Sequence, residues 1–252
     1  MILDFTPAPG AAPNYRRVIR QASYELKSTL RNGEQLLLTL IIPLALLLGL
    51  SLSSIVNLGG TDRVAIVVPG ILTLAVMSTA FTSLAVATGF ERRYGSLTLL
   101  GTTPLTRTQI LAAKGLAVAA VELIQFVMII GVGLMLGWSA TGIGWAIILI
   151  VLGTAAFASL GLLLAGVLRA EATLAIANGI YLILLLAGGT IVSADRLPGS
   201  MSTTVQILPS AALGSGLREA MLHGSFAWFP AVILLAWAGI GGGLAARFFK
   251  WQ

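Results

Sequence analysis

The sequence predicts an all-α integral membrane protein with six transmembrane helices, and three observations support this fold class. Of the 252 residues, 57% are hydrophobic and only 10% are charged, whereas a soluble domain carries roughly a quarter charged residues. Long stretches contain no charge at all, and one helical crossing of a bilayer needs about 20 apolar residues. The positive charges also fall mostly in segments that would share one side of the membrane, as membrane orientation requires.

The chain is expected to form a single transmembrane domain over residues 1–252, because no stretch is polar enough for a separate soluble domain. Residues 1–13 are proline-rich, lack the apolar stretch of a cleaved signal peptide, and are predicted to be a flexible tail. Residues 14–31 place apolar side chains at spacings of three and four between basic ones, which predicts an amphipathic interfacial helix. A solvated helix packed on protein is the alternative for that segment.

The six-span bundle is expected over residues 36–249. Pro43 and Pro69 fall inside predicted spans, where neighbouring helices can satisfy the backbone groups that a proline frees. Two connections are long, at 91–109 and 194–226, and the others are short. The predicted spans cover residues 36–56, 64–90, 110–136, 143–168, 172–193 and 227–249.

The distribution of Lys and Arg predicts the orientation. Twelve of the 15 fall in the N-terminal segment, the region 91–114, the turn after the fourth span and the C-terminus, against three on the opposite side (Arg63, Arg196 and Arg218). This imbalance predicts a multi-pass protein of the plasma (inner) membrane with both termini in the cytoplasm. The net charge of +6 does not indicate nucleic-acid binding, because the basic residues form no stripe interleaved with aromatic ones.

The sequence contains no recognisable catalytic or metal-binding pattern. There is no cysteine and a single histidine, His223, so neither a thiol site nor a pair of imidazoles is available for a metal. The glycine-rich sequence that cradles phosphates before a lysine is absent as well. We therefore expect no enzyme activity and no cofactor in this chain.

The region 91–107 is the most distinctive stretch. It follows a long span and carries both signs of charge, and Pro104 interrupts it before Thr106, which is suited to cap the next helix. Leu97, Leu100 and Leu105 offer an apolar patch. The residues themselves predict a short cytoplasmic helix that a partner could bind, with an ordinary solvated loop as the alternative.

This region resembles the first cytoplasmic loop of permeases in the type-2 ABC exporter family, which includes drug, polysaccharide and lipid exporters. The segment from Leu197-Pro198 to Leu217-Arg218 is similar to the family's region before the last span, so the resemblance covers nearly the whole chain. The loop positions that match the family's pattern in order are Glu91, Gly95, Ser96, Leu97, Thr103, Pro104, Leu105, Thr106, Arg107 and Lys114.

The resemblance implies partners and a mechanism. Two ABC ATPase subunits would bind ATP and Mg beneath two permease subunits, the second permease being identical to this chain or homologous to it. The loop would act as a coupling helix, with the interfacial helix 14–31 as a second contact surface. The coupling residues so implied are Glu91, Arg92, Arg93, Gly95, Leu97, Leu100, Pro104 and Arg107.

Glu122 lies near the middle of the third predicted span, with Gln125 close by. A carboxylate at that depth costs about 2.5–3.5 kcal/mol on insertion scales, so its side chain should face protein or a wet cavity. It either faces a cationic amphiphilic substrate or makes a structural hydrogen bond to a neighbouring helix. Asn178 and Tyr181 in the fifth span are further candidates for a substrate pathway, with packing as their alternative role.

The segment 194–226 is predicted to contain two short amphipathic helices that re-enter the outer leaflet, separated by Pro209, with Ser210 capping the second. Their apolar faces comprise Leu197, Met201, Val205, Leu213 and Leu217. The family resemblance implies that these helices close the outer end of the pathway. An external loop lying on the surface is the alternative.

These observations lead to one principal hypothesis, a permease that exports a hydrophobic or amphiphilic substrate such as a drug, an antibiotic or a lipid. The five tryptophans lie mostly near span ends, as an aromatic belt would place them. Export of a polysaccharide or lipid-linked glycan remains an alternative. Two further alternatives are an ion-coupled secondary transporter with Glu122 as proton carrier and a membrane-anchored assembly subunit. The Ala, Gly, Leu and Arg usage suggests a bacterial source.

Overall fold

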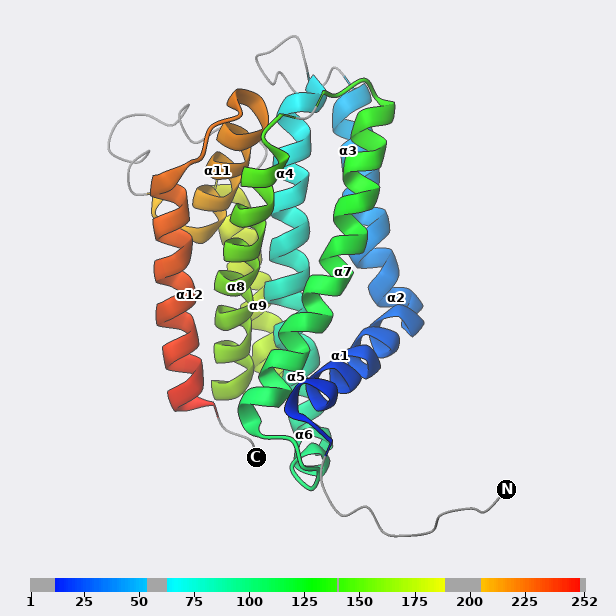
Figure 1. The fold of residues 1–252 in the computed structure, drawn as a ribbon, viewed down its shortest axis with the longest axis vertical. Coiled ribbons are helices and arrows are strands. Elements are labelled where there is room, and N and C mark those ends of the chain that lie inside the picture. Colours follow the sequence, from blue (N-terminus) through cyan, green and yellow to red (C-terminus); the bar gives the residue numbers. More distant parts are fainter. Residues whose placement is uncertain (1–11, 54–62, 140, 189–204, 250–252) are drawn as a thin grey trace.

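The structure is a computed structural model that describes residues 12–53, 63–139, 141–188 and 205–249. Every regular element in these ranges is a helix, and together they form an upright bundle (Figure 1). Five helices are long and apolar enough to cross a membrane, with bounds Arg63–Arg93, Arg107–Met135, Ile143–Val167, Ala170–Ala187 and Trp228–Phe248. They confirm five of the predicted spans, with ends shifted by a few residues; the end of the fifth, after residue 188, lies outside the described ranges.

The first predicted span, 36–56, corresponds to a shorter apolar helix. Gly33–Leu36 (α2), the π-helix Leu37–Ile41 (η1) and Ile42–Leu52 (α3) follow one another without a break. At 1.5 Å per residue their 20 residues extend about 30 Å, close to the thickness of a bilayer's hydrocarbon core. Residues 54–62 lie outside the described part of the chain, so a sixth crossing stays a prediction.

The central helix of the bundle is Arg63–Arg93. It comprises α4 (Arg63–Val76), the π-helix η2 (Met77–Ser83) and α5 (Leu84–Arg93). In its most apolar stretch, 83% of the residues are buried, against 22–44% in the other four spans. Most of the other helices therefore pack around this helix, whereas the last span packs mainly on Ile143–Val167. The exposed apolar side chains of the other spans form the outer surface of the bundle, as expected where lipid is the solvent.

The remaining long helices are α7 (Arg107–Met135), α8 (Ile143–Val167), α9 (Ala170–Ala187) and α12 (Trp228–Phe248). The helix α1 (Asn14–Arg31) lies obliquely across one end of the bundle, beside the short helix α6 (Ser96–Leu100) (Figure 1). At the same end, Phe249 packs against Leu97 and Ile110. The first helix and the end of the last helix therefore share one end of the bundle, as an even number of crossings requires.

Glycine allows the closest backbone contact between the central helix and α8. A Cβ atom added at Gly161 would lie 2.8 Å from the carbonyl oxygen of Phe81 and 3.1 Å from that of Ala80. Both carbonyls belong to η2, so the backbone of α8 packs directly on the π-helix. Small residues at such crossings are the usual way for membrane helices to approach closely.

We expect Gly161→Ala to lower the free energy of unfolding by about 1–3 kcal/mol, because the added methyl group forces two packed backbones apart. Gly144→Ala in the same helix is the matched control, since no atom lies within 4 Å of its added Cβ. Thermal unfolding of both variants in detergent, followed by tryptophan fluorescence, measures the difference. Equal melting temperatures for the two variants would show that the contact with η2 is not tight.

Candidate functional site

The central helix and α7 are joined by residues 94–106, which we call the elbow. Local sequence signals form it. Gly95 has φ of 76°, a left-handed conformation that glycine adopts without strain, and it ends α5 and lets α6 turn back. At the start of α7, the hydroxyl of Thr106 accepts a hydrogen bond from the Gln109 backbone N–H at 3.3 Å, and the Gln109 side chain accepts from the Thr106 N–H at 3.0 Å. The predicted cap at Thr106 is therefore confirmed as a reciprocal capping box.

The apolar patch expected on this elbow faces inward. Leu97 is 2% exposed and packs with Ile110 and Phe249, while Leu100 and Leu105 lie against the same cluster. The outward side chains are Leu99 and Tyr94, which are 70% and 73% exposed. The expectation of a patch free to dock was therefore wrong for Leu97, because the end of α12 covers it within the same chain. Leu100 and Leu105 are half-buried, and a docking role for them stays a prediction.

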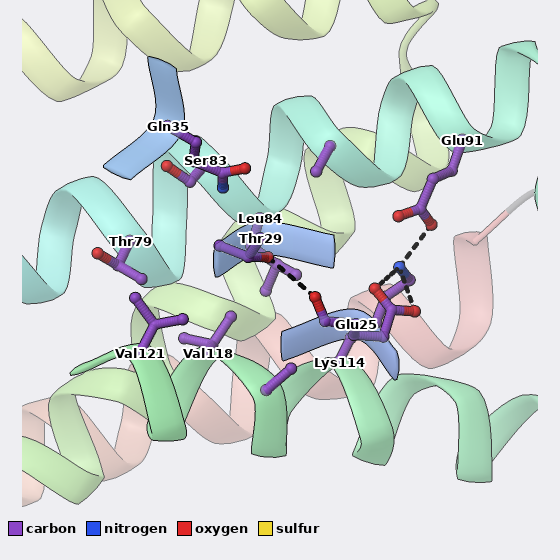
Figure 2. A pocket seen from close by; sticks show the side chains of 12 residues that line it. Glu25, Thr29, Gln35, Thr79, Ser83, Leu84, Glu91, Lys114, Val118 and Val121 are labelled. Carbon is purple, nitrogen blue, oxygen red and sulfur yellow. Dashed lines mark hydrogen bonds and ion pairs between the residues drawn. The ribbon is translucent and has the colours of Figure 1, made fainter. Parts of the chain in front are cut away.

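Three consecutive residues at the end of α5 reach different helices. The first, Glu91, contacts the ammonium group of Lys114 on α7, with Oε2 and Nζ 2.5 Å apart. Lys114 also lies 3.0 and 3.1 Å from the two carboxylate oxygens of Glu25 on α1. Figure 2 shows Lys114 between these two acids. Its side chain is 2% exposed, so the ammonium group has the two carboxylates as partners in place of water.

A cavity of about 50 Å³ extends from this cluster into the bundle. Its polar lining includes Thr29, Gln35, Thr79 and Ser83 as well as Glu25, Glu91 and Lys114 (Figure 2). A space of this size and polarity can hold ordered water. The two carboxylates therefore have polar surroundings beyond Lys114.

Arg92 and Arg93 bind the turn between α8 and α9. The Arg92 guanidinium donates to the carbonyl oxygen of Gly166 at 2.7 Å and to that of Leu168, which lie at the C-terminal end of α8, where backbone carbonyls lack helical partners. Arg93 forms an ion pair with Glu171 in the first turn of α9. That pair is mostly exposed and contributes little to stability. We call Glu25, Glu91, Arg92, Arg93 and Lys114 the basal cluster.

The elbow also contacts α1 directly. The guanidinium of Arg17 donates to the carbonyl oxygen of Pro104. Pro104 and Arg107 are both exposed. Of the predicted coupling residues, Glu91, Arg92, Arg93 and Pro104 thus have defined contacts with other helices, Gly95 supplies the turn, and Leu97 and Leu100 support the elbow from inside.

Gln125 and Glu122 are both buried in the bundle but have different surroundings. The Gln125 amide donates to the carbonyl oxygen of Thr39 at 2.6 Å and accepts from the hydroxyl of Thr79 at 3.1 Å. These partners lie in η1 and η2, so Gln125 joins the two π-helices. Glu122 is 1% exposed and accepts from the Thr154 hydroxyl on α8; its Oε1 has no hydrogen-bond partner among the described residues.

The two candidates in the fifth span lie elsewhere. Asn178 is exposed on the outer side of α9 and its amide donates to the Leu174 carbonyl at 2.9 Å. Tyr181 is half-buried against the main apolar core. The structure therefore does not bring Asn178 to Glu122 within one chain, and the notion that these residues line one shared cavity has no support in this subunit.

The predicted outer segment contains one described helix, α11 (Pro209–His223). Leu213 and Leu217 are fully buried, Val205 is half-buried, and Leu197 and Met201 lie outside the described residues. Ser210 does not cap α11 as predicted: its hydroxyl donates to the Leu184 carbonyl on α9 at 3.0 Å, and the helix begins with Pro209, which suits a first helical position.

The end of α11 is polar and exposed. The Ser225 hydroxyl and His223 both contact the carboxylate of Glu219. The hydrogen bond from Ser225 is the main reason that the pKa of Glu219 lies below its usual value. His223 is therefore a surface residue beside an ionised acid.

Comparison with known proteins identifies the family. The sequence model of the ABC-2 type transporter family matches residues 20–222, which is most of the chain. This chain belongs to the ABC-2 type transporter family. It is also similar to a Bacillus subtilis (strain 168) protein named "Putative transport permease YvfS", with 27% identity over 229 residues that cover 86% of this chain and 91% of the relative.

Family membership defines the chain as the membrane subunit of an ABC transporter and implies association with ABC ATPase partners. The ABC-2 match begins within α1 and ends within α11, so it includes the whole basal cluster. Sequence reasoning missed the roles of Glu25 and Lys114. One signal was available: Glu25 is the single acid among five basic residues in 14–31.

Replacing Lys114 with Met leaves two carboxylates facing each other without a counterion. We expect Lys114→Met to lower the free energy of unfolding by about 2–4 kcal/mol, at the low side of the range for a buried pair because both acids are partly exposed. The triple variant Glu25→Gln/Glu91→Gln/Lys114→Met removes the uncompensated charge and should recover most of the loss. Lys27→Met on the exposed face of α1 is the control.

Unfolding of these variants in mixed detergent measures the difference. A triple variant as unstable as Lys114→Met would mean that the lysine side chain stabilises the bundle through packing and not through charge.

Proposed function

We propose that this chain is the permease subunit of an ATP-driven exporter that moves a hydrophobic or amphiphilic substrate, such as a drug, an antibiotic or a lipid, out of the cytoplasm or the inner leaflet. Two ABC ATPase subunits, which bind ATP and Mg, would act on two permease subunits, identical or homologous. The segment α2–η1–α3 (Gly33–Leu52) would complete six crossings of the plasma membrane, with both termini in the cytoplasm.

The observation that carries this proposal is the basal cluster. Glu91, Arg92 and Arg93 follow one another at the base of the central helix. Glu91 contacts Lys114 on α7, which also binds Glu25 on α1. Arg92 contacts α8, and Arg93 contacts α9. A displacement of the elbow by a bound ATPase would therefore act on four helices at once. In an ordinary solvated loop, the charged side chains would face water and would not contact several different helices.

The surface offered to the ATPase would be the outer side of the elbow. Tyr94 and Leu99 are large apolar side chains that are exposed in a loop that also carries exposed Arg107. Aromatic and apolar anchors surrounded by polar groups are typical of protein interfaces. Leu97 and Leu100 would then act from inside, by supporting the elbow.

Affinity purification of the tagged chain from its native membrane in mild detergent tests the proposal, and we expect a stoichiometric ABC ATPase in the eluate. Tyr94→Asp/Leu99→Asp should reduce ATPase recovery by at least about tenfold, because a charge placed in the desolvated centre of an interface costs more than 1.4 kcal/mol. Met135→Asp is the control, an exposed apolar residue at the opposite end of α7.

Absence of any ATPase from the wild-type eluate would contradict the exporter assignment. Full ATPase recovery with the double variant would contradict the assignment of the elbow as the contact. Thermal unfolding establishes that both variants are folded; only a small decrease is expected for the double variant, because Tyr94 and Leu99 are mostly exposed and Tyr94 loses its stacking on Phe90.

Ion-coupled transport through Glu122 is the second candidate, favoured by the buried carboxylate oxygen that lacks a partner among the described residues. If the chain is an ATP-driven exporter, the role of Glu122 is structural: it accepts the hydrogen bond from Thr154 that links α7 to α8. We expect proteoliposomes of the chain alone to show no proton flux that depends on Glu122, as reported by an internal pH-sensitive dye. Proton flux that is present in the wild type and lost in Glu122→Gln would establish the ion-coupled alternative.

The proposed substrate is an amphiphile, and a glycan is the alternative. Within the described residues, the buried polar groups on α7 are few: Glu122 contacts Thr154 on α8, and Gln125 contacts the two π-helices. Such a sparse set of polar groups suits a largely apolar substrate better than a polysaccharide, which needs many hydrogen-bonding partners. Polysaccharide or lipid-linked glycan export remains the alternative.

A further inference from the structure

The helix α1 has two functional faces. One face holds Glu25, which binds Lys114 and fixes α1 to α7. The other face is exposed and forms a shallow hollow of about 290 Å³. We call it the α1 hollow; it is lined by Tyr24, Lys27, Ser28, Arg31 and Asn32. Because the opposite face is held by the basal cluster, the hollow is presented on a rigid helix.

The α1 hollow is positively charged without a described counterion. Lys27 and Arg31 are four residues apart, so two like charges share one side of the helix, which is unfavourable for the helix alone. No ion pair joins either residue to a carboxylate in the part of the chain that the structure describes; the side chain of Glu34 lies outside that part. The hollow is thus arranged to receive an anion.

The helix dipole does not cancel this attraction. The hollow lies at the C-terminal end of α1, where the dipole is equivalent to about half a negative charge. Lys27 and Arg31 supply two full positive charges, so the net field attracts an anion. Hydroxyl groups of Tyr24 and Ser28 supply further donors, and the Asn32 side-chain oxygen accepts from the Gln35 N–H at 3.2 Å, which leaves the Asn32 amide group free to donate.

The position of the hollow selects the type of anion. Six residues beyond Arg31 the chain enters its first apolar helix, where Leu37, Leu38, Ile41 and Ile42 are all exposed. In a membrane these side chains face acyl chains, so the hollow lies at the level of the headgroups. Tyrosine is also enriched at that level. A ligand with a phosphate and long acyl chains matches both surfaces, whereas an acidic protein surface matches the charge alone.

We propose that the α1 hollow binds the phosphate of an anionic phospholipid whose acyl chains lie along Leu37–Ile42. The bound lipid holds the outer face of α1 while Lys114 holds the inner face, so it stabilises the basal cluster from the membrane side. This site requires that α1 lie at a membrane surface, and it does not require the ATPase partner of the proposed function.

Native mass spectrometry of the delipidated, detergent-solubilised chain tests the site, with phosphatidylglycerol and phosphatidylcholine as probes. We expect phosphatidylglycerol to bind the wild type, and Lys27→Gln/Arg31→Gln to weaken that binding by at least about tenfold, because each basic residue near an anionic headgroup contributes a severalfold factor. Arg16→Gln/Arg20→Gln, which removes the same charge from the other end of α1, should bind like the wild type. Thermal unfolding establishes that both variants are folded.

Four outcomes would overturn the proposal. Equal binding of phosphatidylcholine would remove the role of the anionic headgroup, and equal loss in both double variants would indicate a diffuse charge effect. Displacement of the lipid by millimolar inorganic phosphate would indicate a site for free phosphate. Unchanged lipid binding in Lys27→Gln/Arg31→Gln, together with loss of the co-purified ATPase, would make the hollow a protein contact.

A milder variant keeps the test valid if the double variant does not fold. Tyr24→Phe/Ser28→Ala removes two hydroxyl donors and leaves every charge in place. It should weaken phosphatidylglycerol binding without altering the melting temperature of the lipid-free chain. Failure of the lipid test with normal ATPase recovery would leave the proposed transport function intact, so the two proposals are tested separately.

Discussion

The ammonium group of Lys114 lies inside the protein, and much of the arrangement at the base of the bundle depends on it. A charged group removed from water must find partners of opposite charge, because leaving it unpaired costs several kcal/mol. Here the partners come from two other helices, Glu25 on α1 and Glu91 at the end of α5. The helix α1 must therefore lie against α7, and the central helix must end at this level.

The neighbouring contacts extend that constraint. Arg92 binds carbonyl groups at the end of α8, and Arg93 binds the first turn of α9. Together with Lys114, these contacts join the end of the central helix to α1, α7, α8 and α9. Phe249 supplies the contact with α12 through Leu97. Under the proposed function, a displacement of this base by a bound ATPase would be shared among these helices instead of reaching one helix alone.

The sequence predicted the elements better than their mutual arrangement. Five spans and the Thr106 cap followed from apolar length and capping chemistry, which act within one segment. The inward orientation of Leu97 depends on Phe249, about 150 residues away, and the pairing of Lys114 depends on Glu25. Periodicity defines the faces of each helix but not its rotation against its neighbours.

The membrane environment is a second reason why the sequence did not predict how the helices are oriented. In a soluble protein the apolar face of a helix marks the core, but a lipid-facing surface is as apolar as the interior. Asn178 was expected in the interior of the bundle and is exposed on α9, while Gln125 in a similar apolar context is buried. Composition alone does not distinguish these two positions. The unexpected partners of Gln125, one in each π-helix, are likewise a feature of the packed bundle.

The π-helix η2 has a consequence for the length of the central helix. A π-helical turn takes in one residue more than an α-helical turn, and one residue corresponds to about 100° of rotation. The direction in which the Glu91 side chain leaves the helix is therefore set partly at Met77–Ser83, about two to four turns earlier. A chain shorter by one residue there would keep its apolar character and its caps, yet Glu91, Arg92 and Arg93 would each point to the wrong neighbour. The number of residues in the central helix, as much as their identity, thus determines which neighbouring helix each of these three side chains contacts.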